Sequence, residues 1–460
     1  MDASTHASVN DIVARLERLP TSWWQVKARI IVGVATFFDA FDALVIASIL
    51  PVIAPLWKLS PPQIALMISA GFAGQLLGAL LFGWMAERYG RMPAMIWSIA
   101  LFAVMSLVCA LAWNYDSLLI FRIIQGIGLG GEVPVAAVFI SELARAKGRG
   151  RFVLLYELVF PIGLVAVALV GLWIVPRFGW QMMFVIGALP AFVALVLRSL
   201  LPESPRWLAV RGRNAEAEAA MARIEAETQK AIGQPLPPPA PVAAVLDKPA
   251  SWSDLFGPLY LRRTLTVWVI WFAAYFVNYG LSAWLPTIYR TVFALPLDVS
   301  LRYGLITQCV GLLGTLICAL VIDRVGRRWW FALSFAAAAI ALAALTMYPS
   351  PTAEQALMCV TIAYLFVSTI NIGLYLYTPE LYPTRVRALA VGTSTAWLRL
   401  ASMIGPPVVG LLIGTRLTPA QVPDLPRVFL AFAAVAAFAA VITALFAVET
   451  KGRVLEEASP

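Results

Sequence analysis

The chain contains a single histidine, His6, and only four cysteines among its 460 residues. A relay of histidines through the interior is therefore excluded, and any group that takes up and releases protons there has to be a carboxylate. The cysteines lie in apolar stretches without paired spacing, so the sequence predicts neither a disulfide framework nor a metal centre. No set of nucleophile and base is recognisable either. We therefore expect that the protein is not an enzyme and has no cofactor.

Charged side chains are scarce as well. They make up 13% of the chain, against 61% hydrophobic residues, whereas about a quarter of a typical soluble domain is charged. This composition predicts a polytopic membrane protein with about a dozen apolar spans of ~20 residues each. The spans are predicted at residues 28–55, 64–86, 93–113, 117–141, 152–175, 180–200, 264–286, 302–322, 329–348, 355–378, 388–413 and 427–448.

The net charge of +9 does not predict a nucleic-acid partner. Lys and Arg gather in the loops between apolar runs, where basic residues act as topology signals. Most of the 34 basic residues fall in alternate loops, on the side that holds both termini. We therefore expect a multi-pass protein of the cell's inner (plasma) membrane, surrounded by the lipid bilayer, with both termini in the cytoplasm.

One long polar connection divides the spans into two groups of six. It combines a polar stretch of helical character with a proline-rich linker. We expect five parts: a cytoplasmic N-terminal amphipathic segment, 1–27; a first six-helix bundle, 28–200; a cytoplasmic linker, 201–263; a second six-helix bundle, 264–448; and a cytoplasmic tail, 449–460.

Two motifs occur once in each group of spans. The loop after the second span reads Glu87-Arg88-Tyr89-Gly90-Arg91, and the loop after the eighth reads Asp323-Arg324-Val325-Gly326-Arg327. A Glu-Leu pair follows the fourth span and recurs after the tenth, at nearly the same separation. The repetition predicts an all-α fold of twelve transmembrane helices in two pseudo-symmetric six-helix halves. We interpret the charged positions as a cytoplasmic gate that holds one face shut, rather than as topology signals alone: Glu87, Arg88, Arg91, Glu142, Asp323, Arg324, Arg327 and Glu380.

Asp39 and Asp42 lie inside the first apolar run, three residues apart and thus close together on a helix. A charge at this depth costs about 2.5 kcal/mol or more, so it persists where it faces a cavity or a partner. Arg122 in the fourth span either pairs with one of the two aspartates or snorkels to the membrane surface. Glu132 and Glu157 also lie within spans, and each either takes part in proton coupling or is a protonated, hydrogen-bonded acid. We assign proton coupling to these five residues.

Arg399 lies well inside the eleventh span, where it is the candidate to bind a substrate carboxylate through two parallel hydrogen bonds. The alternative is a structural ion pair with an acid of a neighbouring span. The seventh span carries an aromatic stripe with one amide, and the tenth adds an amide and a tyrosine one turn apart. Such a stripe is more often packing than a ligand cage, but amides among aromatic rings suit a planar polar ligand. The candidates are Trp271, Tyr275, Asn278, Tyr279, Asn371 and Tyr375.

The charges within the spans do not balance. Four acids face two arginines, and an anionic substrate would add to the negative surplus unless protons bound with it. The balance therefore predicts cotransport of a small organic anion with protons.

The duplicated acidic-Arg-x-Gly-Arg loops resemble the signature of the major facilitator superfamily. A narrower resemblance is to the NiaP-type niacin transporters, which are relatives of the synaptic-vesicle glycoproteins. It is carried by Phe38-Asp39-Ala40-Phe41-Asp42, by the segment 128–135 and by Leu155-Tyr156-Glu157. Aromatic-acid:proton symporters share the aspartate pair but usually have a glycine where this chain has Ala40. The resemblance implies that Phe160, Asn278, Tyr279, Asn371 and Tyr375 border a central pocket; Phe160 departs from the tryptophan usual at its position.

Together these features predict a secondary active transporter, a monomer that imports nicotinate or a similar aromatic monocarboxylate with protons by alternating access. The first alternative is a symporter of benzoate or hydroxybenzoate type. The second belongs to another class of function, a membrane receptor that transports nothing.

Overall fold

The computed structural model describes residues 3–20, 22–143, 158–239, 252–414 and 417–451. The described chain is helical and has no strands. The first half contains α2 (Trp23–Leu56), α3 (Pro61–Tyr89), α4 (Arg91–Ala110), α5 (Tyr115–Leu143), α7 (Val159–Phe178), α8 (Gln181–Gly187) and α9 (Ala191–Leu200). The second half contains α12 (Leu261–Ser282), α13 (Leu285–Thr291), α14 (Leu297–Val325), α15 (Arg327–Ala343), α16 (Ala353–Glu380), α17 (Thr384–Ile413) and α18 (Leu425–Phe446).

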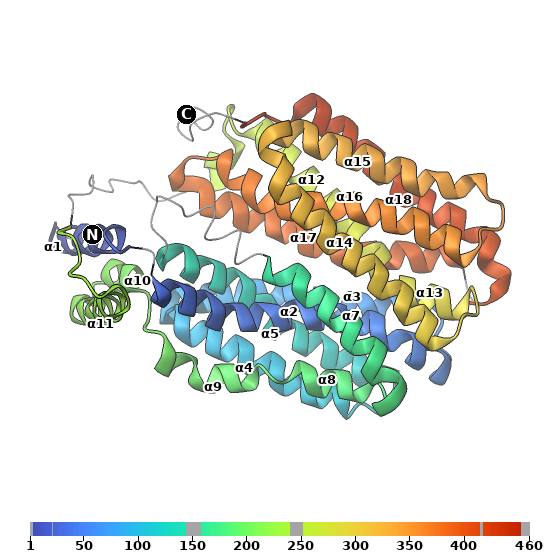
Figure 1. The fold of residues 1–460 in the computed structure, drawn as a ribbon, viewed down its shortest axis with the longest axis horizontal. Coiled ribbons are helices and arrows are strands. Elements are labelled where there is room, and N and C mark those ends of the chain that lie inside the picture. The colour runs from blue at the N-terminus through green and yellow to red at the C-terminus, as the bar shows by residue number, and fades with distance from the viewer. Residues whose placement is uncertain (1–2, 21, 144–157, 240–251, 415–416, 452–460) are drawn as a thin grey trace.

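Eleven segments of the described chain are long and apolar enough to cross a membrane. The sixth expected span, at residues 180–200, is not among them, because a turn at residues 188–190 divides it into α8 and α9. Pro190 explains the division, because it has no N–H to donate to the preceding turn of the helix. Figure 1 shows α8 and α9 following each other along the bundle, so the pair takes the place of one span. The all-helical architecture is the twelve-helix arrangement expected from the sequence.

The seventh span is also divided. A short break at Ala283 and Trp284 separates α12 from α13. The indole Nε1 of Trp284 donates to the carbonyl oxygen of Pro406 in α17 at 3.1 Å, which ties the break to a neighbouring helix. Non-helical backbone at membrane depth persists where protein covers it, and Trp284 is fully buried.

The two halves lie side by side, with the first half below the second in Figure 1. Helix α3 packs against α17, α7 against α14, and α2 against α13. We call the end of the bundle that carries α1 (Ala3–Glu17), α10 (Pro205–Val210) and α11 (Asn214–Ile232) the terminal end, since the last described residues lie there too. The opposite end, which holds the connections 57–60 and 292–296, is the far end.

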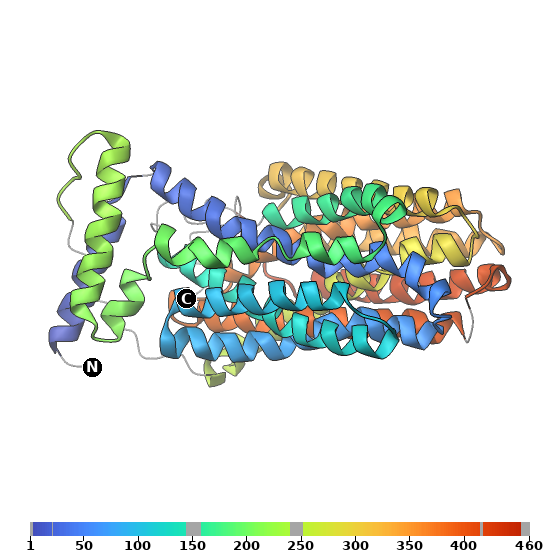
Figure 2. The ribbon, with the colours of Figure 1, turned by 90° about the horizontal axis from the view of Figure 1, so that it is seen from below.

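Helices α1, α10 and α11 form a separate layer across the terminal end of the first half (Figure 2). Leu16 and Leu19, at the C-terminal end of and just after α1, are buried in one apolar cluster with Leu208 of α10 and Met221 of α11. The predicted amphipathic N-terminal segment therefore directs its apolar face at the linker helices.

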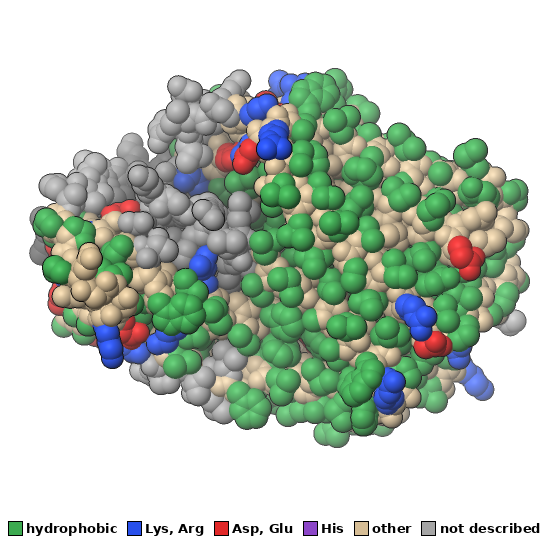
Figure 3. All heavy atoms as spheres, in the orientation of Figure 1, with side chains coloured by type: hydrophobic (Ala, Val, Ile, Leu, Met, Phe, Trp, Pro, Cys, Tyr) green, Lys and Arg blue, Asp and Glu red, His purple; other side chains and the backbone are tan. Residues whose placement is uncertain are grey.

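The outer surface of the bundle is apolar. Leu80, Leu320 and Ile340 are among the long apolar side chains that are largely exposed. Figure 3 shows hydrophobic side chains covering most of one face, with charged side chains toward the two ends. A soluble protein rarely exposes such a large apolar surface, and the arrangement is that of a multi-pass membrane protein.

Candidate functional site

A buried polar cluster inside the first half joins Asp42 of α2 to two residues of α5. Arg122 Nη1 donates to Asp42 Oδ2 at 2.8 Å and to Gln125 Oε1 at 2.9 Å. Gln125 Nε2 donates to Asp42 Oδ1 at 2.8 Å, which closes a triangle. All three side chains are buried. Of the two alternatives for Arg122, the structure therefore has the ion pair, with Asp42 as the partner.

Asp39 lies less than a turn before Asp42 on α2 but has different surroundings. The residue is buried, and its Oδ1 has no hydrogen-bond partner among the described residues. It interacts electrostatically with Arg399 of α17 and with Asp42 itself. Three helical residues turn the chain through about 300°, so the two carboxylates diverge by about 60°. One aspartate is therefore held by its own half, whereas the other interacts electrostatically with the second half.

Of the two glutamates predicted to couple protons, the structure describes only Glu132. Glu132 of α5 is buried and accepts a hydrogen bond from Thr36 Oγ1 of α2 at 3.1 Å. This contact fits the alternative of a hydrogen-bonded buried acid, and it does not exclude a role in coupling. Glu157 lies outside the described residues.

Arg399 reaches from the second half into the first. Its Nη1 donates to Gln75 Oε1 of α3 at 2.8 Å, and its Nη2 donates to the carbonyl oxygen of Gly130 in α5 at 3.3 Å. The side chain is buried. Within the described chain it makes no ion pair at 4.0 Å or less, although Asp39 and Glu132 interact with its charge. The alternative of a close structural ion pair is thus not seen in this part of the chain.

The aromatic stripe of the seventh span forms a continuous column. Trp271 and Tyr275 stack with ring centroids 5.6 Å apart, and Tyr275 stacks on Tyr279 at 6.1 Å. Tyr375 of α16 meets the Trp271 ring edge-on at 5.0 Å. The Tyr279 end of the column contacts the first half, since the ring centroids of Tyr279 and Phe72 of α3 lie 4.8 Å apart. The predicted aromatic candidates of α12 and α16 are therefore neighbours in space.

Two predicted amides carry buried oxygen atoms that lack a hydrogen-bond partner within the described chain, Asn278 Oδ1 and Asn371 Oδ1. Such atoms are costly to bury, so a ligand that formed hydrogen bonds with them would recover that cost.

Phe160 lies near the start of α7, half-buried against the apolar core. Electrostatic interactions link Arg399 with Asp39, Tyr279 and Tyr375, so the candidate anion and proton residues surround one point in the middle of the bundle.

The duplicated loop motifs form matching charge clusters at the terminal end. In the first half Arg91 Nη1 donates to Glu87 at 2.8 Å, and Arg91 Nη2 donates to Glu142 at 2.9 Å. Glu203 completes the cluster by accepting the backbone N–H groups of Arg91 and Met92 at the start of α4. Burial raises the pKa of Glu203, while these hydrogen bonds act in the opposite direction.

The second half repeats this arrangement. Arg327 binds Asp323 at 2.8 Å and Glu380 at 3.0 Å. Glu449 accepts the backbone N–H groups of Arg327 and Arg328 at the start of α15, and a carboxylate at the start of a helix is favourable. In the described chain each cluster ties helix ends within its own half, so a role as a gate between the halves stays a prediction.

The remaining gate candidates have simpler contacts. The Arg88 guanidinium lies 5.7 Å from the ring centroid of Trp84 and 5.8 Å from that of Tyr89. The backbone oxygen of Arg324 accepts a hydrogen bond from Lys451. Neither contact crosses between the halves.

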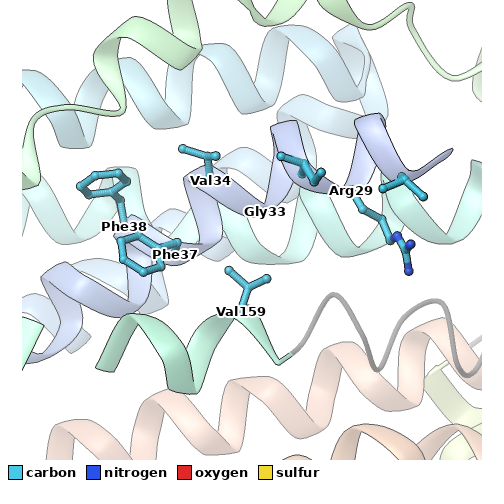
Figure 4. Close-up of a pocket in the computed structure, with 8 residues that line it drawn as sticks. Arg29, Gly33, Val34, Phe37, Phe38 and Val159 are labelled. Carbon is cyan, nitrogen blue, oxygen red and sulfur yellow. The ribbon is translucent and has the colours of Figure 1, made fainter. Parts of the chain in front are cut away.

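A cavity of about 530 Å³ opens between α2 and α7, away from this central point. Its lining is apolar apart from Arg29 and includes Gly33, Phe37 and Val159 (Figure 4). A pocket with no amide or carboxylate and one basic group lacks the polar groups that orient a ligand. The described residues also contain no cluster of acidic, histidine or cysteine side chains that could hold a metal ion.

Four residues with clear partners at these sites were not predicted from the sequence: Gln75, Gln125, Glu203 and Glu449. Gln75 is a polar residue in the middle of an apolar run, which is the same signal that identified Arg399. Glu203 and Glu449 follow the sixth and the last span, so they form a third repeated position beside the two motifs that were recognised.

The sequence matches the family described as "Sugar (and other) transporter" over residues 28–460. It is 33% identical to the niacin transporter NiaP of Acinetobacter baylyi, covering 97% of this chain and 99% of that protein. It is 31% identical to the putative niacin/nicotinamide transporter NiaP of Bacillus subtilis, over 83% and 87% of the two chains. The 4-hydroxybenzoate transporter PcaK of Acinetobacter baylyi is 29% identical over 95% of each chain.

The fold is similar to that of the xylose transporter XylE from E. coli, with a TM-score of 0.71 and 19% identity, covering 94% of this chain and 100% of that one. Fold, family match and relatives agree that the protein is a transporter and not an enzyme. The chain belongs to the sugar (and other) transporter family.

Proposed function

We propose that the protein is a proton-coupled importer of nicotinate or a closely similar aromatic monocarboxylate. The observation that carries this proposal is the position of Arg399. Its buried guanidinium lies near the aromatic residues Tyr279 and Tyr375 and is held by neutral oxygens rather than by a carboxylate at ion-pair distance. A buried cation held in this way favours an anionic ligand. The two niacin-transporter relatives point to the same kind of substrate.

The aromatic column supplies the second half of the recognition. A flat ring can stack against Tyr275 or Tyr375, and Phe160 flanks the pocket from α7 in this proposal. The ring nitrogen of nicotinate accepts a hydrogen bond, which the amide of Asn278 or Asn371 can donate, because the two ends of an amide are assigned rather than observed. Trp271 holds the base of the column through its bond to Thr378.

Proton coupling is assigned to Asp39, with Asp42 and Arg122 as the supporting pair and Glu132 and Glu157 as further candidates. Asp39 has a buried carboxylate oxygen with no hydrogen-bond partner among the described residues, and it interacts with the charge of Arg399. A proton on Asp39 leaves the positive charge of Arg399 available to the substrate carboxylate. Binding of proton and anion would then support each other.

The proposal includes alternating access, which the two-half architecture supports, with the terminal end in the cytoplasm and the chain acting as a monomer in the inner membrane. The gate residues Glu87, Arg91, Glu142 and their counterparts then keep each half rigid at its cytoplasmic end. Of the domain boundaries proposed above, those after residues 200 and 448 fall outside the helices, whereas those after residues 27 and 263 fall inside α2 and α12.

A second candidate substrate is 4-hydroxybenzoate, which the relative PcaK transports according to its name. As oriented, the unbonded oxygens of Asn278 and Asn371 are acceptors, and they suit a phenolic hydroxyl, which donates. The two substrates share the ring and the carboxylate and differ in the group opposite it. Asn278→Ala and Asn371→Ala would weaken whichever substrate uses the amide.

The test is uptake of radiolabelled nicotinate into proteoliposomes with an imposed inward proton gradient, competed with 4-hydroxybenzoate and with glucose. We expect accumulation that stops when an uncoupler collapses the gradient. Arg399→Gln should lower the affinity for nicotinate by about a hundredfold or more. Arg427→Gln is the matched control, because Arg427 is exposed at the far end. Uptake that ignores the uncoupler, or that glucose alone inhibits, would overturn the proposal.

A further inference from the structure

The two halves meet along one face of α3 and one face of α17. At the far end, a Cβ atom on Gly410 would lie 2.9 Å from the Ala65 side chain. One turn deeper, Ser69 Oγ donates to the carbonyl oxygen of Met403 at 2.7 Å. The innermost contact of this row is the bond between Gln75 and Arg399. The interface is therefore a zipper that runs from the far end to the middle of the bundle.

The Gln75–Arg399 contact differs from the others in this row because it carries a charge. The outer contacts are made by small side chains and backbone atoms, whereas the innermost holds a guanidinium. Gly130 adds its backbone oxygen from α5. Five N–H groups of a guanidinium can donate, so Arg399 retains donors for a ligand while it is held by the first half.

Gln75 is fixed rigidly to the first half. Helices α3 and α5 touch through glycines, since a Cβ on Gly74 would lie 2.1 Å from the Ile123 carbonyl oxygen. A Cβ on Gly130 would lie 2.1 Å from the carbonyl oxygen of Gln75. The absence of side chains lets Gln75 and the Gly130 carbonyl meet Arg399 at one place. If the halves separate at the far end, both acceptors leave Arg399 together.

The charged and titratable groups around this contact come from four helices. Asp39 and Asp42 lie on α2, and Glu132 and Arg122 on α5. Tyr279 lies on α12 and Tyr375 on α16. Among these, no described acid approaches Arg399 to 4.0 Å, so the neutral Gln75 is its closest side-chain partner by hydrogen bonding.

We propose that Gln75 is the positioning residue that ties closure of the far end to Arg399, the residue that binds the substrate anion. When the zipper closes, Gln75 and Gly130 orient the guanidinium; when it opens, the guanidinium is released toward the pocket. The statement that Arg399 binds the substrate anion rests on the proposed function. The gating role of Gln75 rests on the contacts alone.

The experiment measures opening of the far end without any substrate. Ala65→Cys, beside Gly410, reports opening through its rate of alkylation by a water-soluble maleimide in purified, detergent-solubilised protein. Cys309→Ala removes the exposed cysteine of the described chain, whose three other cysteines are buried. In this background Gln75→Leu breaks the contact, while Gln75→Glu turns it into an ion pair with Arg399.

We expect Gln75→Leu to raise the alkylation rate about threefold or more, and Gln75→Glu to lower it by a similar factor, because hydrogen bonds to charged groups are stronger when both partners are charged. The effect of Gln75→Glu should vanish when it is combined with Arg399→Gln. Ser69→Ala is the control, since it removes a neutral hydrogen bond of the same zipper. In the Ser69→Ala background, Gln75→Leu and Gln75→Glu should still change the alkylation rate. Gln75→Glu is nearly isosteric and keeps the test valid if the leucine variant fails to fold.

Equal rates for the glutamate and leucine variants, or an effect of Gln75→Glu that persists without Arg399, would overturn the gating role. The outcome does not depend on nicotinate. If nicotinate uptake fails while the alkylation rates change as expected, the substrate assignment falls and the gating role stands. If uptake succeeds and the rates do not change, only the gating role falls.

Discussion

The two aspartates of α2 show how one turn of helix separates a structural residue from a functional candidate. Asp42 has both carboxylate oxygens bonded, to Arg122 and to Gln125. Asp39 has an unbonded oxygen and interacts with the charge of Arg399 in the other half. Because a buried ion pair is costly to break but contributes little when intact, the pair at Asp42 specifies the packing of α2 on α5. Asp39, which has no such partner on its Oδ1, is the residue that we propose takes up a proton.

Removing each carboxylate should therefore have a different effect. We expect Asp42→Ala to destabilise the protein by about 3–5 kcal/mol, because it leaves Arg122 buried without a partner. Asp39→Ala should cost about 1 kcal/mol or less and abolish gradient-driven accumulation. Thermal unfolding in detergent measures the first effect and proteoliposome uptake the second. Each variant is the matched control of the other, and equal losses of stability would contradict the distinction.

The sequence predicted these buried charges well because each stands alone in an apolar run. It left two partners open for Arg122, since a spacing of three residues does not say which aspartate faces α5. It did not predict Gln75, whose role depends on a helix of the other half. Contacts between residues that are hundreds of positions apart follow from packing of the halves, which no local pattern contains.

At the scale of elements, Glu225 of the linker binds two arginines at the end of the N-terminal helix. Arg15 Nη2 and Arg18 both donate to Glu225 of α11, the first at 2.7 Å. Arg15 also pairs with Glu218, which is more exposed. Partial burial raises the pKa of Glu225, but hydrogen bonds from the two arginines outweigh it, so the pKa lies below its ordinary value. The linker helix and α1 therefore form one unit with the first half.

Glu225→Ala should release α1 from α11 and cost about 1–3 kcal/mol of docking free energy. Because the folded pKa of Glu225 is lowered, its contribution is complete above the unfolded pKa near 4.5 and is lost as the pH falls through the lower, folded value. Hydrogen exchange of α1 measures the release. Glu218→Ala is the control, since an exposed pair contributes about 1 kcal/mol or less. Equal hydrogen exchange in the two variants would contradict the role of Glu225 in holding α1 on α11.

Span positions were predictable because apolar runs of membrane length have one physical explanation. The breaks inside the sixth and seventh spans were not predicted. Pro190 is visible in the sequence, but Trp284 breaks the seventh span through a contact with α17 that only the folded chain provides. The docking of α1 was equally hidden, because an amphipathic helix can face a membrane or a protein.

For the whole molecule, the distribution of contacts separates rigid units from the moving interface. Both terminal-end charge clusters join residues of one half only. The described contacts of α3 with α17 lie toward the far end and in the middle. The structure is thus held together between the halves at the far end, and a transport cycle requires that this interface open and close.

Gly410 gives a direct test of that requirement. A Cβ there would lie 2.9 Å from the Ala65 side chain and 3.0 Å from the Pro61 carbonyl oxygen, so Gly410→Leu should prevent closure of the far end. We expect uptake to fall by about tenfold or more while nicotinate binding changes by about threefold or less, since the loss is in the conformational step and not in the site. Gly392→Leu is the matched control, because a Cβ at Gly392 of the same helix meets no atom of the described residues within 4 Å. Normal uptake in Gly410→Leu would show that the far end does not need this close contact, and a parallel loss of binding would place the damage in the site instead.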